Sequence, residues 1–269
     1  MFDDDTQELL TPAPDLQSMI DWLGEKEVLL TDAAVRVVKT PWNAFDFIPF
    51  SEELARFALY KNGFTLGETF PEHEVLHKLS TELAIMSPGD LDERFLHTLE
   101  GAPLTREFRR LAQVPDIRGL LKNTTGLGWS GFHNQSVSEA DARQITRRRM
   151  VIDANRELYD WTALRAWEIA EAAALIHLAR SMGMLNETDL LPYAKRLTTE
   201  AAVRFVSWAD FALSLLRAQL FSEAAEDASE LIVRLGDDWD QVEAALQGPW
   251  LTTEWPIFTG ADPYLTVPA

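Results

Sequence analysis

Apolar residues recur at helical spacing along most of the chain, most clearly in its second half. In two such stretches the apolar positions are Leu190, Leu191, Ala194 and Leu197, and then Trp208, Phe211, Leu215 and Leu216. A repeat of three to four residues is typical of amphipathic helices that bury one face. The pattern therefore predicts a mainly α fold, a packed multi-helix array. The proline- and aromatic-rich segment breaks this pattern, so we expect a small β or irregular element near residues 28–50.

Capping residues and helix breakers divide the pattern into separate helices. Asn186 and Ser207 precede periodic stretches as N-caps, whereas Gly183 follows one as a C-cap. These signals predict helices at residues 15–23, 51–59, 71–86, 90–99, 103–113, 116–122, 138–180, from 186, from 207, at 222–235 and from 237. The 138–180 stretch is either one helix or two with a break near Leu158. After Gly248 we expect an extended Trp-rich tail.

Glycines crowd into residues 123–136, which predicts a loop between two halves. We therefore expect a flexible tail at 1–13, an N-terminal helical region at 14–136 and a C-terminal helical region at 137–269. One continuous domain is the alternative.

Charge and composition exclude or disfavour several classes of function for this chain. The net charge is −19, which disfavours binding to nucleic-acid phosphates and fits either solubility or a basic protein partner. The chain has no cysteine, so disulfides, thiolate catalysis and cysteine-ligated zinc are excluded. It has no run of 18 apolar residues, and its acidic start is unlike a secretory signal. These features predict a soluble cytoplasmic protein that does not bind membranes.

The second half resembles a known bacterial family. Trp167-Glu168 is followed by Gly183 and later by Ser207-Trp208, and the chain ends in a Trp-rich segment. This pattern, over about residues 155–257, resembles DUF1266, a domain of unknown function. The resemblance implies a helical domain and no known activity.

The chain also departs from the family pattern. Ala170-Glu171 and Ala218-Gln219 stand where the family usually has Gly-Arg, so an anion site built on those arginines would be lost here. We interpret Trp167 and Trp208 as core residues, Ser207 as an N-cap, and Glu168 as a partner for a nearby arginine.

The sharpest chemical motif is His73-Glu74-Val75-Leu76-His77. On a helix, His73 and His77 would share a face and could hold zinc, and Glu74 could act as a general base. Lys78 after the second histidine is unusual for such a motif. The third ligand would have to be Glu93, His97 or Glu100. The alternative interpretation is a partly solvated helix face without metal.

Two charged stretches offer binding surfaces. Arg143, Arg147 and Arg148 could bind an anion, or they could pair with acids on neighbouring helices. An acidic stretch could bind a basic partner, or it could be a solvated helix face; its candidate residues are Glu223, Glu226, Asp227, Glu230, Asp237 and Asp238.

The sequence therefore favours a non-enzymatic protein-interaction role without a cofactor. Its most specific form is an acidic inhibitor or immunity-type partner of a basic protein. The alternative is a zinc-dependent hydrolase that uses His73, Glu74 and His77.

Overall fold

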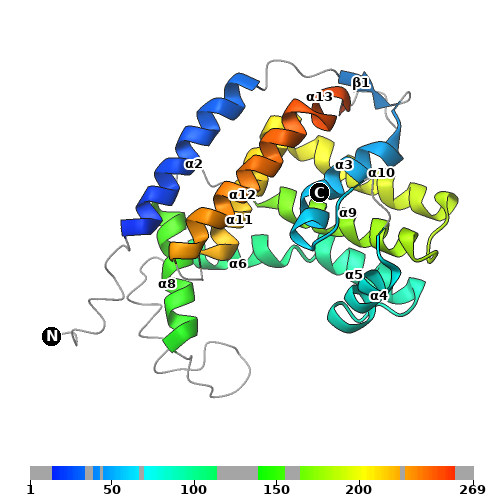
Figure 1. Ribbon diagram of the computed structural model, residues 1–269, viewed down its shortest axis with the longest axis horizontal. Coiled ribbons are helices and arrows are strands. Elements are labelled where there is room, and N and C mark those ends of the chain that lie inside the picture. Colours follow the sequence, from blue (N-terminus) through cyan, green and yellow to red (C-terminus); the bar gives the residue numbers. More distant parts are fainter. Residues whose placement is uncertain are drawn as a thin grey trace.

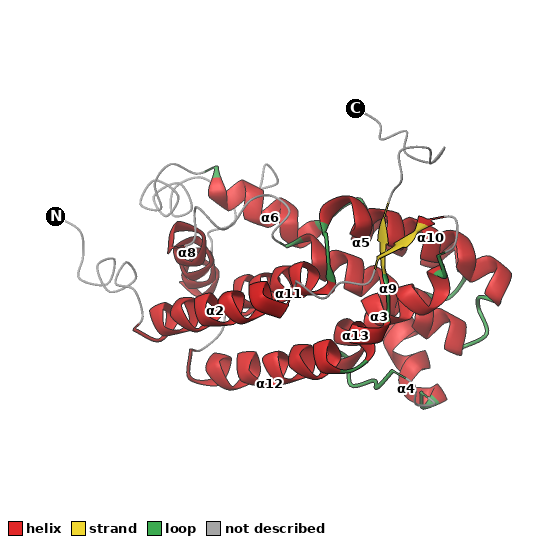
Figure 2. Ribbon diagram, turned by 90° about the horizontal axis from the view of Figure 1, so that it is seen from above, coloured by secondary structure: helices red, strands yellow, loops and turns green. Residues whose placement is uncertain are grey.

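The computed structural model describes residues 14–33, 39–42, 45–66, 70–113, 139–154, 164–224 and 228–257. These residues form a packed helical array with one small sheet, which confirms the predicted mainly α fold (Figures 1 and 2). The elements are α2 (Pro14–Ala33), β1 (Lys39–Pro41), α3 (Phe47–Lys61), α4 (Glu72–His77), the π-helix η3 (Lys78–Glu82), α5 (Pro88–Leu99), α6 (Pro103–Ala112), α8 (Glu139–Ala154), α9 (Arg165–Ser181), α10 (Glu187–Arg204), α11 (Trp208–Glu223), α12 (Ala228–Gln247), α13 (Pro249–Thr252) and β2 (Trp255–Ile257).

Helix α9 is the centre of the array. Its sequence, RAWEIAEAAALIHLARS, is apolar on nearly every side, and most of its residues are buried. A helix that is apolar all round is expected in a protein core. It packs against α3, α5, α10 and α11, so it joins elements from both predicted halves of the chain (Figure 1).

One hydrophobic core runs through the described residues. It includes Leu54 and Phe57 of α3 together with Ile169 of α9 and Phe211 of α11. Helix α2 adds to it by packing against α11 and α12. The predicted boundary loop at residues 123–136 lies outside the described residues. Among the helices described, none combines the length and apolar character needed to cross a bilayer.

The small sheet joins two distant parts of the chain. Strands β1 and β2 are parallel, with Lys39 paired to Trp255 and Pro41 to Ile257. This sheet is the β element expected near residues 28–50. Tryptophans fix it to the helices, because Trp255 Nε1 donates to Phe205 O at 3.1 Å and Trp208 Nε1 donates to Thr253 O at 2.8 Å.

Several helices are longer than their sequence signals predict. Helix α2 continues through Gly24, and α12 continues through Gly236, where the sequence predicted a stop. Helix α3 begins at Phe47 rather than at residue 51, since Pro49 is tolerated in a first turn. Burial of the apolar face outweighs the cost of a single glycine, which is about 1 kcal/mol relative to alanine.

The predicted helix at 71–86 is shorter and irregular. Helix α4 ends at His77, a π-helical turn follows, and Ala84 adopts a left-handed conformation with φ 55°. The Trp-rich end also differs from expectation, because α13 precedes the extended strand β2.

Candidate functional site

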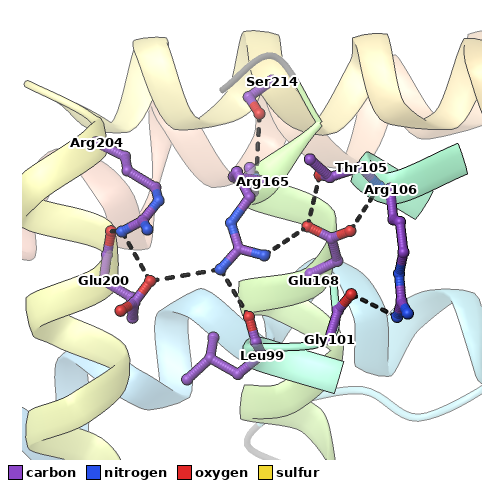
Figure 3. A network of polar contacts seen from close by, with 10 residues as sticks. Leu99, Gly101, Thr105, Arg106, Arg165, Glu168, Glu200, Arg204 and Ser214 are labelled. Atoms are coloured by element: carbon purple, nitrogen blue, oxygen red, sulfur yellow. Dashed lines mark hydrogen bonds and ion pairs between the residues drawn. The ribbon is translucent and has the colours of Figure 1, made fainter. Parts of the chain in front are cut away.

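A buried polar network surrounds the first turn of α9, where two residues of the family resemblance lie (Figure 3). The carboxylate of Glu168 is 1% exposed. Its Oε1 accepts from the Thr105 amide at 2.8 Å, and its Oε2 accepts from the Thr105 hydroxyl at 2.8 Å. Arg165 Nη1 donates to the same Oε2 at 3.0 Å. Both carboxylate oxygens are therefore occupied by protein donors.

This network supplies hydrogen-bond partners to backbone groups at the turn between α5 and α6, which we call the α5–α6 corner: the Leu99 carbonyl and the Thr105 amide. Helix α6 follows Ala102, which has a left-handed φ of 42° and provides no side-chain cap. Glu168 supplies the missing acceptor from another helix, and the positive end of α6 favours its charge. Arg165 Nη2 donates to Leu99 O, the last carbonyl of α5, at 2.7 Å. One turn of α9 thus caps two other helices.

Helices α10 and α11 complete the network. Glu200 Oε2 lies 3.4 Å from Arg165 Nη2 and 2.7 Å from Arg204 Nη1. Ser214 Oγ accepts from the Ala166 amide at 3.2 Å, which caps α9 because Leu164 at its N-cap position provides no side-chain acceptor. The network therefore connects five helices.

Burial raises the pKa of Glu168, and the hydrogen bonds from Thr105 and Arg165 oppose that shift. Burial likewise lowers the pKa of Arg204, and Glu200 opposes it. Two arginines face two glutamates, so the charges of this network balance. A carboxylate held by three donors is suited to positioning helices; a general base needs to reach a substrate proton.

The other residues of the family resemblance also hold structural positions. Ser207 stands at the N-cap of α11, and its Oγ accepts from the Asp210 amide at 3.2 Å. Gly183 has a φ of 71° just after α9, a conformation that glycine adopts without strain. Trp208 stacks on Trp250 with ring centroids 4.9 Å apart. Trp167 lies half-buried, with its ring centroid 6.2 Å from that of Phe57.

The three ionisable residues of the His73-Glu74-Val75-Leu76-His77 motif lie on the surface, and Val75 is buried. The side chains of His73 and His77 are 85% and 65% exposed. Each lies near a glutamate, His73 Nε2 at 3.8 Å from Glu74 Oε1 and His77 Nδ1 at 3.7 Å from Glu82 Oε1. Within the described part of the chain, no three His, Asp or Glu side chains come together as a metal site. The zinc hypothesis stays a prediction, to be checked by elemental analysis of the protein and of His73→Ala.

Of the arginines predicted to bind an anion, Arg143, Arg147 and Arg148, the last two differ in their contacts. Arg148 donates to Phe221 O at 3.2 Å, to Ser222 O at 3.1 Å and to Glu107 Oε1 at 2.9 Å, so it caps α11. Arg147 is partly buried, and its Nε and Nη2 have no hydrogen-bond acceptor among the described residues. The side chain of Arg143 lies outside the described residues.

The acidic residues predicted to bind a basic partner are likewise divided, into residues paired with Lys61 and an exposed residue. Asp238 is 1% exposed, and Lys61 Nζ lies 3.1 Å from both its Oδ1 and Glu223 Oε1. Burial raises the pKa of Asp238 to about 6, and Lys61 opposes that shift. Lys61 of α3 therefore joins Glu223 of α11 to Asp238 of α12, whereas Asp237 is exposed. Glu226, Asp227 and the side chain of Glu230 lie outside the described residues.

Ser51 and His177 form a buried pair that could not be predicted from the sequence, because the two residues are 126 positions apart. Ser51 Oγ donates to Ile48 O at 2.8 Å and lies 3.1 Å from His177 Nε2. A Ser51 hydroxyl that donates to Ile48 O is an acceptor for the Nε2–H tautomer of His177. This direction is opposite to that of a nucleophilic serine activated by histidine.

Thr105 and Ser214, which complete the network around α9, were not predicted as site residues either. Proline at residue 103 signals the start of α6, but nothing nearby indicates that a carboxylate of α9 would cap it.

Searches of curated proteins and of solved structures gave no match. The family model described as a protein of unknown function, DUF1266, matches residues 13–255. The match is wider than the resemblance over 155–257 and includes the histidine motif at 73–77. This chain belongs to the DUF1266 family.

Proposed function

We propose that this protein acts by binding another protein of basic character through the outer face of α12. The observation that carries the proposal is the composition of that face. Val233, Asp237 and Asp240 lie on one side of the helix by their spacing, with Ile232 and Glu243 along its edge. All five are exposed, Ile232 at 50% and Val233 at 63%. Figure 2 shows α12 at the outside of the array.

The nearby cations do not neutralise this face. Helix α12 carries five acidic residues and one arginine, Arg234. The Nε of Arg234 points to Glu223, 3.6 Å away, and Lys61 is held by Glu223 and Asp238. Asp237 and Asp240 have no ion pair with any residue in the described ranges. Exposed carboxylates beside apolar side chains favour a partner that is basic and partly apolar.

A more specific form of the proposal is an inhibitor or immunity-type partner of a basic protein. The net charge of −19 supports this form, because opposite charges on two proteins accelerate their association. Binding of this kind needs no catalytic group on the inhibitor.

A native pull-down from the source cell tests the proposal. The test variant carries Asp240→Lys and Glu243→Lys on α12. The matched control carries Glu72→Lys and Glu93→Lys, two exposed carboxylates on α4 and α5. We expect a stoichiometric basic partner with the wild type and the control, and at least about a tenfold loss with the α12 variant. Equal retention by all three proteins, or no partner at all, would contradict it.

A further inference from the structure

Helices α6 and α8 concentrate positive charge in a strongly acidic chain. They pack against each other. Helix α6 and residues 144–154 of α8 together contain six arginines and only two acidic residues, Glu107 and Asp153. The arginines are Arg106, Arg109, Arg110, Arg147, Arg148 and Arg149. Their summed field attracts anions to this corner of the molecule.

The guanidinium of Arg147 presents two buried donors. The Nε–H and Nη2–H groups of an arginine point in the same direction and form a fork that matches two oxygens of one oxyanion. Arg149 uses this fork for Asp153, with Nε at 2.9 Å from Oδ2 and Nη2 at 2.9 Å from Oδ1. Arg56 uses it for Glu53, at 2.7 and 2.8 Å.

In Arg147 the same two atoms are buried and meet no acceptor among the described residues. Leaving a charged donor pair buried without an acceptor costs free energy, which a bound anion would recover. The neighbouring side chains do not compete for such an anion, since Arg148 and Arg149 are held by Glu107, Asp153 and backbone carbonyls.

We propose that Arg147 is the anchor of an oxyanion site at the α6–α8 corner, and that its ligand is a phosphate group. The fork supplies two parallel hydrogen bonds, and the excess of arginines favours a dianion over a singly charged carboxylate. This site is separate from the acidic face of α12.

Isothermal titration calorimetry with inorganic phosphate tests the site, with chloride used to keep ionic strength constant. The proteins are the wild type, Arg147→Met, and Arg110→Met as a matched control whose guanidinium is half-exposed on the same corner. We expect wild-type binding that weakens at least about tenfold in Arg147→Met and less than about threefold in Arg110→Met. A parallel titration with acetate should show weaker binding.

Thermal unfolding in phosphate-free buffer gives a second readout. Because Arg147→Met removes two buried donors that meet no acceptor among the described residues, it should unfold at the same temperature as the wild type or higher. The proposal is overturned if the wild type binds no phosphate, if both variants lose binding equally, or if Arg147→Met unfolds at a clearly lower temperature. Acetate binding as tight as phosphate binding would overturn the phosphate assignment.

Discussion

The imidazole of His177 lies in the core on α9 and is 6% exposed. Burial lowers its pKa to about 4, Arg180 adds to that shift, and a hydrogen bond with the backbone of Ser51 opposes it. The ring is therefore neutral at pH 7, with its Nε2 atom 3.1 Å from Ser51 Oγ. Glu168 is likewise buried and matched to specific partners, Thr105 and Arg165, whereas Arg147 Nε and Nη2 meet no acceptor among the described residues.

Protonation of His177 should destabilise the folded protein. The pKa is about 4 in the folded chain and about 6.5 in the unfolded chain, so the unfolded chain binds the proton more readily between these values. The free energy of unfolding should fall by about 3 kcal/mol as the pH is lowered from 6.5 to 4. Urea unfolding of the wild type and His177→Gln between pH 7 and 4.5 measures this contribution.

The comparison with His177→Gln is needed because Glu171 and Asp238 act in the opposite direction. Burial raises their pKa values to about 7 and about 6, so their protonation favours folding as the pH falls. These two contributions are present in both proteins and cancel in the difference. An identical pH dependence of stability in the two proteins would contradict the assigned role of His177.

Among the secondary-structure elements, several helix ends are stabilised by side chains from other helices. The corner between α5 and α6 is tight, since a Cβ added at Gly101 would lie 2.2 Å from His97 O and 3.3 Å from Arg106 Nη2. Both helix ends at this corner are satisfied by Arg165 and Glu168 of α9. The corner therefore has little freedom to adjust.

Gly101→Ala should lower the free energy of unfolding by about 1–3 kcal/mol, because the new methyl group meets a backbone carbonyl. Gly236→Ala is the matched control, as its Cβ would meet nothing within 4 Å inside α12. That control should be more stable than the wild type by up to about 1 kcal/mol. Chemical denaturation of both variants checks the signs. A neutral Gly101→Ala would show that the corner is looser than described.

The helices themselves could be predicted from periodicity, but several of their ends could not. Local caps such as Asn186 and Ser207 are read directly from sequence, and both accept backbone hydrogen bonds in the structure. Gly236 resembles a stop signal, yet burial of Leu235 and Trp239 carries α12 through it. The caps from Glu168 and Ser214 were not predicted, because they depend on tertiary contacts across 63 and 48 positions.

Charge is unevenly distributed over the whole molecule. The outer face of α12 is acidic and partly apolar, whereas α6 and α8 carry an excess of arginines. A single hydrophobic core supports both surfaces. The positions that carry the family resemblance serve the fold as helix caps, ring contacts and ion pairs, with Glu168 and Trp208 buried and Gly183 exposed at the end of α9. Both of our functional proposals therefore concern the surfaces that this core supports.

We infer that the network around Glu168 holds the fold together. Thermal unfolding at pH 7.5 of the wild type, Glu168→Gln and Glu171→Gln tests this inference. Glu171 is a matched control on the same helix, because it is half-buried and accepts no hydrogen bond from a described residue. Glu168→Gln removes the closer of the two carboxylates that face the buried Arg165 and leaves only Glu200, 3.4 Å from Arg165 Nη2. Breaking a buried ion pair in this way typically costs roughly 3–5 kcal/mol.

We predict that Glu168→Gln lowers the unfolding midpoint by on the order of 10 °C. Glu171→Gln should leave the midpoint unchanged or raise it, because burial already disfavours the charged form of Glu171. A Glu168→Gln protein as stable as the wild type would contradict the role of this network in holding the fold together and would make Glu168 a candidate for a direct functional role.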